Sequence, residues 1–175
     1  MCEHNSILED MQLVIIAHNL RSAHNVGSLL RTADGLGITE VILTGYTPYP
    51  LMENDTRMPH LANKIDRQIN KTALDAAAPW RQAESIEPVL ADLRGHGYTI
   101  AALEQSSSSI RLPDFESPAQ LALILGREVE GVEPEILAQC DLCLEIPMFG
   151  SKESFNVVQA AAMAMYHVTF YEHMV

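Results

Sequence analysis

Short apolar runs that recur along this chain constrain its fold more than any other feature of the sequence. Each run is long enough for a buried strand. Segments with helical periodicity separate several of the runs, such as the apolar stripe that follows Asn25. Apolar strands separated by helices indicate an α/β fold, with a parallel sheet covered by helices on both faces. Strands are predicted at residues 13–17, 40–44, 99–103, 121–125 and 142–146, and helices from Asn25 to Gly35 and at residues 63–71, 86–95, 135–139 and 155–171.

Length and composition place the chain among soluble globular proteins. We expect its 175 residues to form a single domain, 1–175. With 47% hydrophobic and 19% charged residues, the chain is neither disordered nor a coiled coil. Its apolar runs are shorter than the about 20 residues that a bilayer span needs, and its acidic N-terminus does not resemble a secretion signal. We therefore expect a cytoplasmic protein that associates with no membrane.

The three cysteines, Cys2, Cys140 and Cys143, are too few for a disulfide framework. Cys140 and Cys143 have the CxxC spacing of zinc ligands, but no second pair accompanies them. Burial as small hydrophobic side chains is the simpler interpretation, and no metal is expected.

The charge of the chain is strongly negative and unevenly distributed. Twenty-three acids against eleven bases give a net charge of −12, which argues against a protein that coats nucleic acid without specificity. Electrostatic screening over about 8–10 Å makes local charge matter more than the total, so a locally basic segment can still contact phosphate. On charge alone, the solvated faces of ordinary helices remain the simpler interpretation. The basic segment contains Arg57, Lys64, Arg67, Lys71 and Arg81.

Polar and glycine-rich segments follow the predicted strands, and parallel α/β sheets bind ligands at the carboxyl ends of their strands. After the fourth strand, Gly126 and Gly131 lack the spacing of a dinucleotide-binding motif, and the acids beside them favour a ligand that carries positive charge. Arg31 falls on the apolar stripe of the first helix, so its guanidinium is expected to find a partner or to face a cleft. His18 could act as an acid or base, or simply form a hydrogen bond. Asn156 precedes the last helix and could equally be its N-cap.

Three separate segments stand out, at residues 25–34, 123–132 and 146–157. Taken together, they resemble the motifs of the SpoU/TrmH family of RNA ribose 2′-O-methyltransferases, in the SPOUT superfamily. Residues 25–34, NVGSLLRTAD, are similar to the first motif, and residues 123–132, LILGREVEGV, to the second. The third motif resembles residues 146–157, IPMFGSKESFNV. The family often has a serine where this chain has Val158. The motifs occur in the family's order and span almost the whole chain.

The resemblance implies a deep trefoil knot in the C-terminal part of the fold, a homodimer, and no separate RNA-binding domain. It implies S-adenosylmethionine as the cofactor, held by loops at the carboxyl ends of the last three predicted strands. The residues expected to bind it are Leu103, Glu104, Gly126, Gly131, Ile146, Met148, Ser154, Phe155 and Asn156. The catalytic residues implied are Arg31, Asn25, Glu128, Ser154 and Asn156.

The implied reaction is methyl transfer to a ribose 2′-hydroxyl of structured RNA, with tRNA favoured over rRNA. A pKa above 12 makes Arg31 a poor base, so we expect it to orient the hydroxyl and stabilise its developing charge. Glu128 would hold Arg31 or the knotted loop in place, while Ser154 and Asn156 would fix the geometry. We expect the RNA to contact a continuous positive strip near the cofactor, made of Arg21, Arg57, Lys64, Arg67 and Lys71.

Two other readings remain open from the sequence. One is a catalytically inactive RNA-binding protein of the same fold. The other is a nucleotide-binding or interaction domain that acts on no RNA, which the acidity of the chain favours.

Overall fold

The computed structural model describes residues 11–170. Cys2 and Tyr171, which enter the sequence arguments above, lie outside this range. The strands are β1 (Gln12–His18), β2 (Glu40–Thr44), β3 (Trp80–Ala83), β4 (Thr99–Leu103), β5 (Ile110–Arg111), β6 (Gln120–Leu125) and β7 (Leu142–Glu145). The helices are α1 (Ala23–Leu36), α2 (Pro59–Ala73), α3 (Glu87–Gly95), α4 (Pro134–Leu137) and α5 (Val157–Phe170), with a 3-10 turn at Leu112–Asp114.

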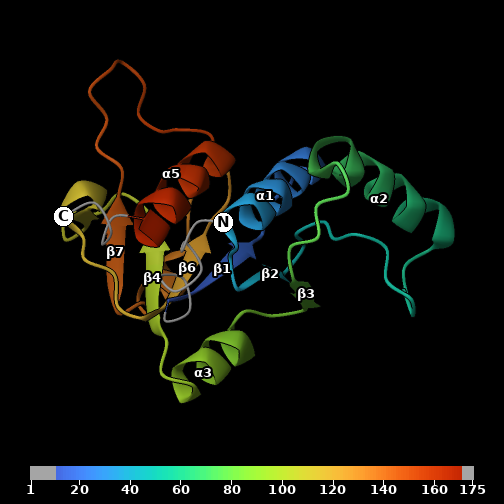
Figure 1. The fold of residues 1–175 in the computed structure, drawn as a ribbon, viewed down its shortest axis with the longest axis horizontal. Coiled ribbons are helices and arrows are strands. Elements are labelled where there is room, and N and C mark those ends of the chain that lie inside the picture. Colours follow the sequence, from blue (N-terminus) through green and yellow to red (C-terminus); the bar gives the residue numbers. More distant parts are fainter. Residues whose placement is uncertain (1–10, 171–175) are drawn as a thin grey trace, which may run out of the picture.

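The strands form one parallel sheet in the order β3-β2-β1-β6-β4-β7-β5 (Figure 1). Ile15 of β1 lies opposite Val41 of β2 on one side and Leu123 of β6 on the other. The predicted α/β class and all five predicted strands are confirmed. The prediction missed β3 and β5, because these outermost strands lack a buried apolar run: β3 is half-buried and β5 is exposed.

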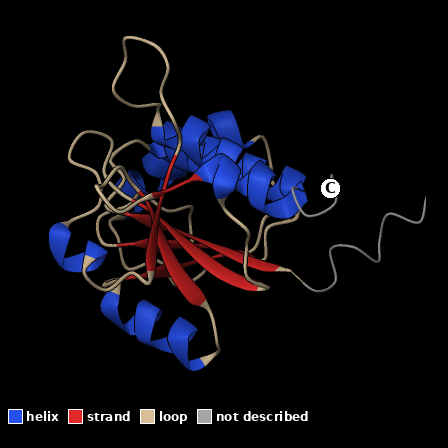
Figure 2. Ribbon diagram, turned by 90° about the vertical axis from the view of Figure 1, so that its left-hand side faces the viewer, coloured by secondary structure: helices blue, strands red, loops and turns tan. Residues whose placement is uncertain are grey.

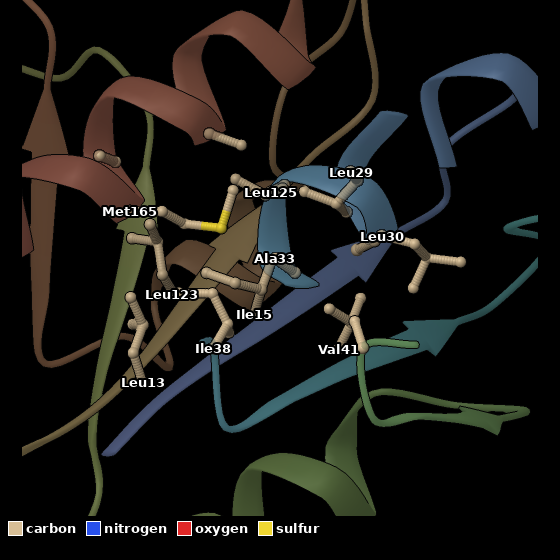
Figure 3. Close-up of a cluster of buried hydrophobic side chains, with 14 of the residues drawn as sticks. Leu13, Ile15, Leu29, Leu30, Ala33, Ile38, Val41, Leu123, Leu125 and Met165 are labelled. Carbon is tan, nitrogen blue, oxygen red and sulfur yellow. The ribbon is translucent and has the colours of Figure 1, made fainter. Parts of the chain in front are cut away.

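Helices cover both faces of the sheet, as Figure 2 shows. Alternate residues of β1 face opposite sides, so that Ile15 belongs to one core and Ile16 to the other. On the first side, α1 and α5 pack against the sheet, and Met165 of α5 lies beside the α1 and β6 side chains (Figure 3). On the second side, α3 and Ile136 of α4 cover the sheet.

Helix α2 is longer than predicted and packs mainly against α1. It begins at Pro59, a residue suited to the first helical turn because its missing N–H needs no partner there. Gly27 of α1 makes the close approach possible, since a Cβ at that position would overlap the Ile69 carbonyl of α2. The hydroxyl of Thr72 donates to the carbonyl of His24 at 2.8 Å and fastens the two helices.

The predicted apolar stripe of the last helix is only partly correct. Val158 and Met165 are buried, whereas Ala162 is half-buried and Tyr166 is exposed. The buried face runs instead through Ala161, Ala164 and Val168, because α5 packs against α1 and β1 along that side. The trefoil knot stays a prediction of the resemblance. Among residues 11–170, no helix combines the length and apolarity that crossing a bilayer requires.

Candidate functional site

A cavity of about 300 Å³ lies at the carboxyl ends of β4, β6 and β7. That volume is at the lower end of the usual range for small-molecule sites, and the position is where parallel α/β sheets bind ligands. Its wall comes from three parts of the sequence: the segments around the ends of β4 and β6, and the stretch from the end of β7 into α5. The lining residues are Leu103, Glu104, Gln105, Leu125, Gly126, Arg127, Glu128, Val129, Glu130, Gly131, Leu144, Glu145, Ile146, Met148, Glu153, Ser154, Phe155, Val157 and Ala160.

The loop after β6 closes on itself at one side of the cavity. Arg127 N donates to the Gly131 carbonyl at 3.0 Å, and Gly131 N donates back to the Arg127 carbonyl at 3.1 Å. A Cβ on Gly126 would overlap the backbone of Gly131 and Val132, and Gly131 has a φ of 72°, a conformation that glycine adopts readily. Glu104, which directly follows β4, holds this loop in place, because its carboxylate accepts a hydrogen bond from Val132 N at 3.0 Å.

Glu128 ties the same loop to the start of α1. Its carboxylate accepts from the backbone N–H groups of Arg21 and Ser22, at 3.3 and 3.2 Å, and from the side-chain amide of Asn25 at 3.2 Å. Burial alone would raise the pKa of Glu128, but these hydrogen bonds outweigh it and hold the pKa below its usual value. The first and second motif segments therefore meet through a carboxylate that stays ionised at neutral pH.

Residues 12–166 match the sequence model of the SpoU rRNA methylase family, which covers most of the chain. The chain belongs to this family. It is 28% identical over 167 residues to a protein of Staphylococcus haemolyticus assigned to the TrmH family of tRNA/rRNA methyltransferases, a match that covers 95% of this chain and 62% of that protein. It is 27% identical over 173 residues to a tRNA (guanosine(18)-2′-O)-methyltransferase of Saccharomyces cerevisiae, covering 97% of this chain and 11% of that one.

The fold also matches a crystal structure of an rRNA methyltransferase from Sinorhizobium meliloti with AdoMet bound. The TM-score is 0.73 at 20% identity, over 96% of this chain and 59% of that chain. This likeness confirms the SpoU methylase fold. The chain spans less than two thirds of the length of the relatives named above.

The structure brings most of the expected cofactor-binding residues together. Of the nine, eight lie in the cavity wall, from all three predicted strand-end loops, the last of which leads into α5. The exception is Asn156, whose side-chain oxygen accepts from Val158 N at 3.0 Å and caps α5. Of the residues expected to be catalytic, Glu128 and Ser154 line the cavity, and Asn25 reaches the wall through Glu128.

The position predicted for Arg31 is wrong. The buried arc of α1 runs through Val26, Leu29, Leu30 and Ala33, and Arg31 lies outside that arc with its side chain exposed. Successive positions of a helix turn by about 100°, so a residue that follows a buried leucine points away from the core. Arg31 is absent from the cavity wall, and no hydrogen bond or ion pair joins it to another of residues 11–170. Glu128 accordingly holds the loop and not Arg31.

The predicted continuous positive strip is also wrong within one chain. Arg21 forms an ion pair with Glu130 at 2.9 Å. Arg57 is held inside its own loop, where it pairs with Asp55 and lies 3.6 Å above the centre of the Tyr49 ring. The remaining three, Lys64, Arg67 and Lys71, are exposed on one face of α2. Figure 1 shows α2 at the opposite end of the molecule from β7 and the loop that follows it.

Sequence reasoning missed a polar network behind the cavity wall. Arg127 donates to Glu133 through Nε, at 3.0 Å, and through Nη2. The amide of Asn19 donates to the same Glu133 oxygen at 2.8 Å and to His18 Nε2 at 3.0 Å. Burial lowers the pKa of His18, only partly offset by Glu133, and His18 Nδ1 lies 2.8 Å from the hydroxyl of Thr44. The sequence offers one hint of this network: the basic residue Arg127 is followed six residues later by the acid Glu133.

The two described cysteines contribute no functional group to the cavity. Burial raises the pKa of the Cys140 thiol to about 11 and also raises that of Cys143, so both thiols are protonated at neutral pH. Among residues 11–170, no group of three or more His, Cys, Asp or Glu side chains is arranged to hold a metal ion.

Proposed function

We propose that this chain transfers a methyl group from S-adenosylmethionine to a ribose 2′-hydroxyl of structured RNA in the cytoplasm, with tRNA favoured over rRNA. The observation that carries the proposal is the convergence of the strand-end loops into one cavity, in a member of the SpoU rRNA methylase family. The yeast relative, a tRNA 2′-O-methyltransferase, supports the reaction and the RNA class. The AdoMet-bound structure of similar fold supports the cofactor.

The residues of the cavity fit S-adenosylmethionine. Its sulfonium and ammonium groups are cationic, and five glutamates line the wall. Glu145 and Glu153 are held least by neighbouring groups. Among the described residues, Glu145 accepts a hydrogen bond only from Ser109, at 2.6 Å. No hydrogen bond or ion pair joins the Glu153 side chain to another described residue. Met148, Phe155 and Leu103 supply apolar surface for an adenosine. A dinucleotide would bring two phosphates to the same acids and is disfavoured.

When bound, the cofactor supplies an electrophilic methyl group on a sulfonium, and the residues of this chain have to hold the ribose in line with it. We assign that positioning to Ser154 in the wall. Glu128 keeps the first-motif helix against the cavity loop. Asn156 acts indirectly, by capping α5 and fixing the backbone that carries Ser154.

We infer that a group for the developing charge on the ribose oxygen comes from outside the described wall of one chain. The single cation in that wall, Arg127, donates to Glu133 through Nε and Nη2, which leaves only Nη1 without a partner among residues 11–170. Arg31 is exposed and without a partner in residues 11–170. We propose that a homodimer, or the bound RNA itself, brings Arg31 to the reacting hydroxyl, where it orients the hydroxyl and lowers its pKa.

The exposed face of α2 is the proposed RNA contact. Lys64, Arg67 and Lys71, with His60 one turn earlier, lie on one stripe of the helix that spans about 16 Å. None of the three cations forms an ion pair with another of residues 11–170. Because α2 does not line the cavity, an RNA that contacts both has to extend beyond the reacting nucleotide. This arrangement favours a structured RNA over a single nucleotide as the substrate.

Calorimetric titration with S-adenosylmethionine, followed by methyl transfer to folded tRNA and rRNA fragments, tests the proposal. We expect cofactor binding, transfer to tRNA, and ribose methylation at a defined nucleotide when total RNA is mapped with and without the gene. Arg31→Ala should abolish transfer and leave cofactor affinity unchanged, while Arg81→Gln, at the opposite edge of the sheet, should retain both. RNA binding without cofactor binding would favour the inactive RNA-binding protein of the same fold.

A further inference from the structure

The cavity wall contains one cation among several acids. Arg127 is the only basic residue that lines the cavity in the part of the chain that the structure describes. The acids are Glu104, Glu128, Glu130, Glu145 and Glu153. A guanidinium at such a wall can pair with a neighbouring acid, bind an anionic group of the ligand, or do both through different N–H groups. Its hydrogen bonds show which N–H groups are already used.

Arg127 makes its hydrogen bonds away from the five wall acids. Its Nε and Nη2 both donate to Glu133 Oε1, and Glu133 is not a lining residue. A guanidinium has five N–H donors, and Nη1 donates to no group among residues 11–170. Arg127 lines the cavity, and its side chain remains 29% exposed.

A hydrogen bond from Asn19 holds Glu133 in place, and Glu133 in turn fixes the position of Arg127. The amide of Asn19 donates to Glu133, and the Asn19 oxygen accepts from Tyr46 N at 3.2 Å. Asn19 has a φ of 58°, a left-handed conformation that asparagine tolerates better than most residues. A Cβ on Gly45 would overlap the Asn19 side chain, so the packing leaves the amide little freedom.

We propose that Arg127, held by Glu133, binds the carboxylate of the amino-acid part of S-adenosylmethionine. The inference rests on the proposed function and goes beyond it, because it assigns a subsite and a positioning residue. S-adenosylmethionine carries two cationic groups and one carboxylate, and the wall offers several acids and one guanidinium. Arg127 is the ligand-binding residue, and Glu133 acts through it by fixing the orientation of the fork.

The charges around Arg127 favour this carboxylate over an RNA phosphate. A phosphodiester at Arg127 would lie beside acids that repel it, and the RNA backbone has no cationic group to offer them. The amino-acid part of the cofactor presents an ammonium next to its carboxylate, so the same acids attract it. The experiment therefore has to distinguish binding of the cofactor carboxylate at Arg127 from binding of an RNA phosphate there.

Calorimetric titration of the full chain with two ligands tests the assignment. The ligands are S-adenosylmethionine and its decarboxylated form, which keeps the sulfonium and the ammonium and lacks only the carboxylate. Arg127→Gln should weaken S-adenosylmethionine binding about tenfold to a hundredfold, the usual effect of losing a hydrogen bond to a charged group. It should leave the affinity for the decarboxylated ligand unchanged.

Glu133→Gln should produce a smaller loss with the same selectivity, and the double variant should bind no more weakly than Arg127→Gln alone. A purely structural role for Glu133 would weaken both ligands equally. Arg81→Gln removes a comparable ion pair, 3.1 Å from Glu40 at the far edge of the sheet, and should change neither affinity.

The outcomes separate the failure of this inference from the failure of the proposed function. If the wild-type chain binds neither ligand, both are overturned. If it binds both, and Arg127→Gln weakens both equally or neither, only the carboxylate assignment is overturned. Unchanged cofactor binding with a lower RNA affinity and a shallower salt dependence would assign Arg127 to the RNA instead.

Discussion

The cavity wall and the exposed face of α2 carry opposite charges, and the two regions hold their charges in different ways. In the wall, Glu104 and Glu128 accept hydrogen bonds from backbone N–H groups of neighbouring segments, so these acids are part of the loop structure. On α2, the side chains of Lys64, Arg67 and Lys71 are exposed and form no ion pair with another described residue. Under the proposed function, the first region is preorganised for a cationic ligand, whereas the second can adapt to the phosphates of a structured RNA.

The different locations of the acids and the exposed cations reconcile the net charge of −12 with the proposed binding of RNA. The acids lie where a small cationic ligand fits, and the cations that form no ion pair lie on α2, a helix that does not line the cavity (Figure 1). With screening over about 8–10 Å, each region acts on what is near it. Substitutions in one region should therefore leave the binding function of the other intact, and a failure of that independence would refute the comparison.

The largest effect is expected at Gly126. A valine side chain there would overlap the backbone of Gly131 and Val132, so the loop can no longer close between Arg127 and Gly131. Gly126→Val should abolish S-adenosylmethionine binding and lower the free energy of unfolding by about 1–3 kcal/mol, as overpacking does. Calorimetry and denaturant unfolding measure the two effects.

Gly150→Val is the matched control, because a Cβ at Gly150 has no atom within 4 Å. It should leave both quantities near the wild-type values. The sequence alone suggested that Gly126 touches the cofactor, whereas the structure assigns its effect to loop closure. Normal cofactor affinity in Gly126→Val would contradict the importance of a closed loop.

An intermediate effect is expected on α2. Replacing Lys64, Arg67 and Lys71 together by glutamine should weaken tRNA binding at least tenfold and reduce the slope of log affinity against log salt by about 2–3, because each phosphate contact contributes about 0.7–0.9. Cofactor affinity should not change. Filter binding across a salt series, with calorimetry for the cofactor, provides both readings.

Arg81, Arg94 and Arg111 replaced together by glutamine give a control with the same change in net charge, drawn from residues that already form ion pairs. The control should retain most of the RNA affinity and its salt slope. An equal loss in the control would mean that net charge alone governs RNA binding, and α2 would lose its assigned role.

The sequence predicted the parts of this molecule that depend on local pattern. Apolar runs reveal buried strands such as β6 and β4. The SpoU motifs supplied six of the predicted residues of the cavity wall, and the segment after β4 supplied two more. Strand β3 was not predicted because a half-buried edge strand needs no apolar run. The positions of Arg31 and Arg57 were not predicted because the exposure of one and the ion pair of the other depend on how α1 and the Tyr49 loop pack.

The network around Glu133 could not be predicted either, since it joins the ends of β1 and β2 to the start of α4. Such contacts depend on the sheet order and on the left-handed conformation of Asn19, which no short motif encodes. Many residues that line the cavity fall in recognisable motifs, whereas the residues that hold them in place are distributed along the chain.

We expect the smallest effect from His18, which lies behind the cavity wall. Its titration tests whether the cavity wall and the exposed face of α2 act independently. Burial lowers its pKa below the usual 6.5, so the unfolded chain binds the proton more readily than the folded one. The stabilising effect of the neutral imidazole is present above pH 6.5 and is lost as pH falls from there through the lowered pKa. One proton gives a slope of at most about 1.4 kcal/mol per pH unit.

Urea unfolding between pH 8 and pH 5 should show this slope in the wild type and not in His18→Gln. Glu128 and Glu133, whose pKa values are lowered from 4.5, lose their contributions only at more acid pH, so the two windows are distinct. His96→Gln is the control, since that side chain is exposed on the far side of the sheet and should leave the slope in place. RNA affinity should not follow the His18 transition, because α2 lies outside this network; a parallel loss of RNA binding would show that the two regions are coupled.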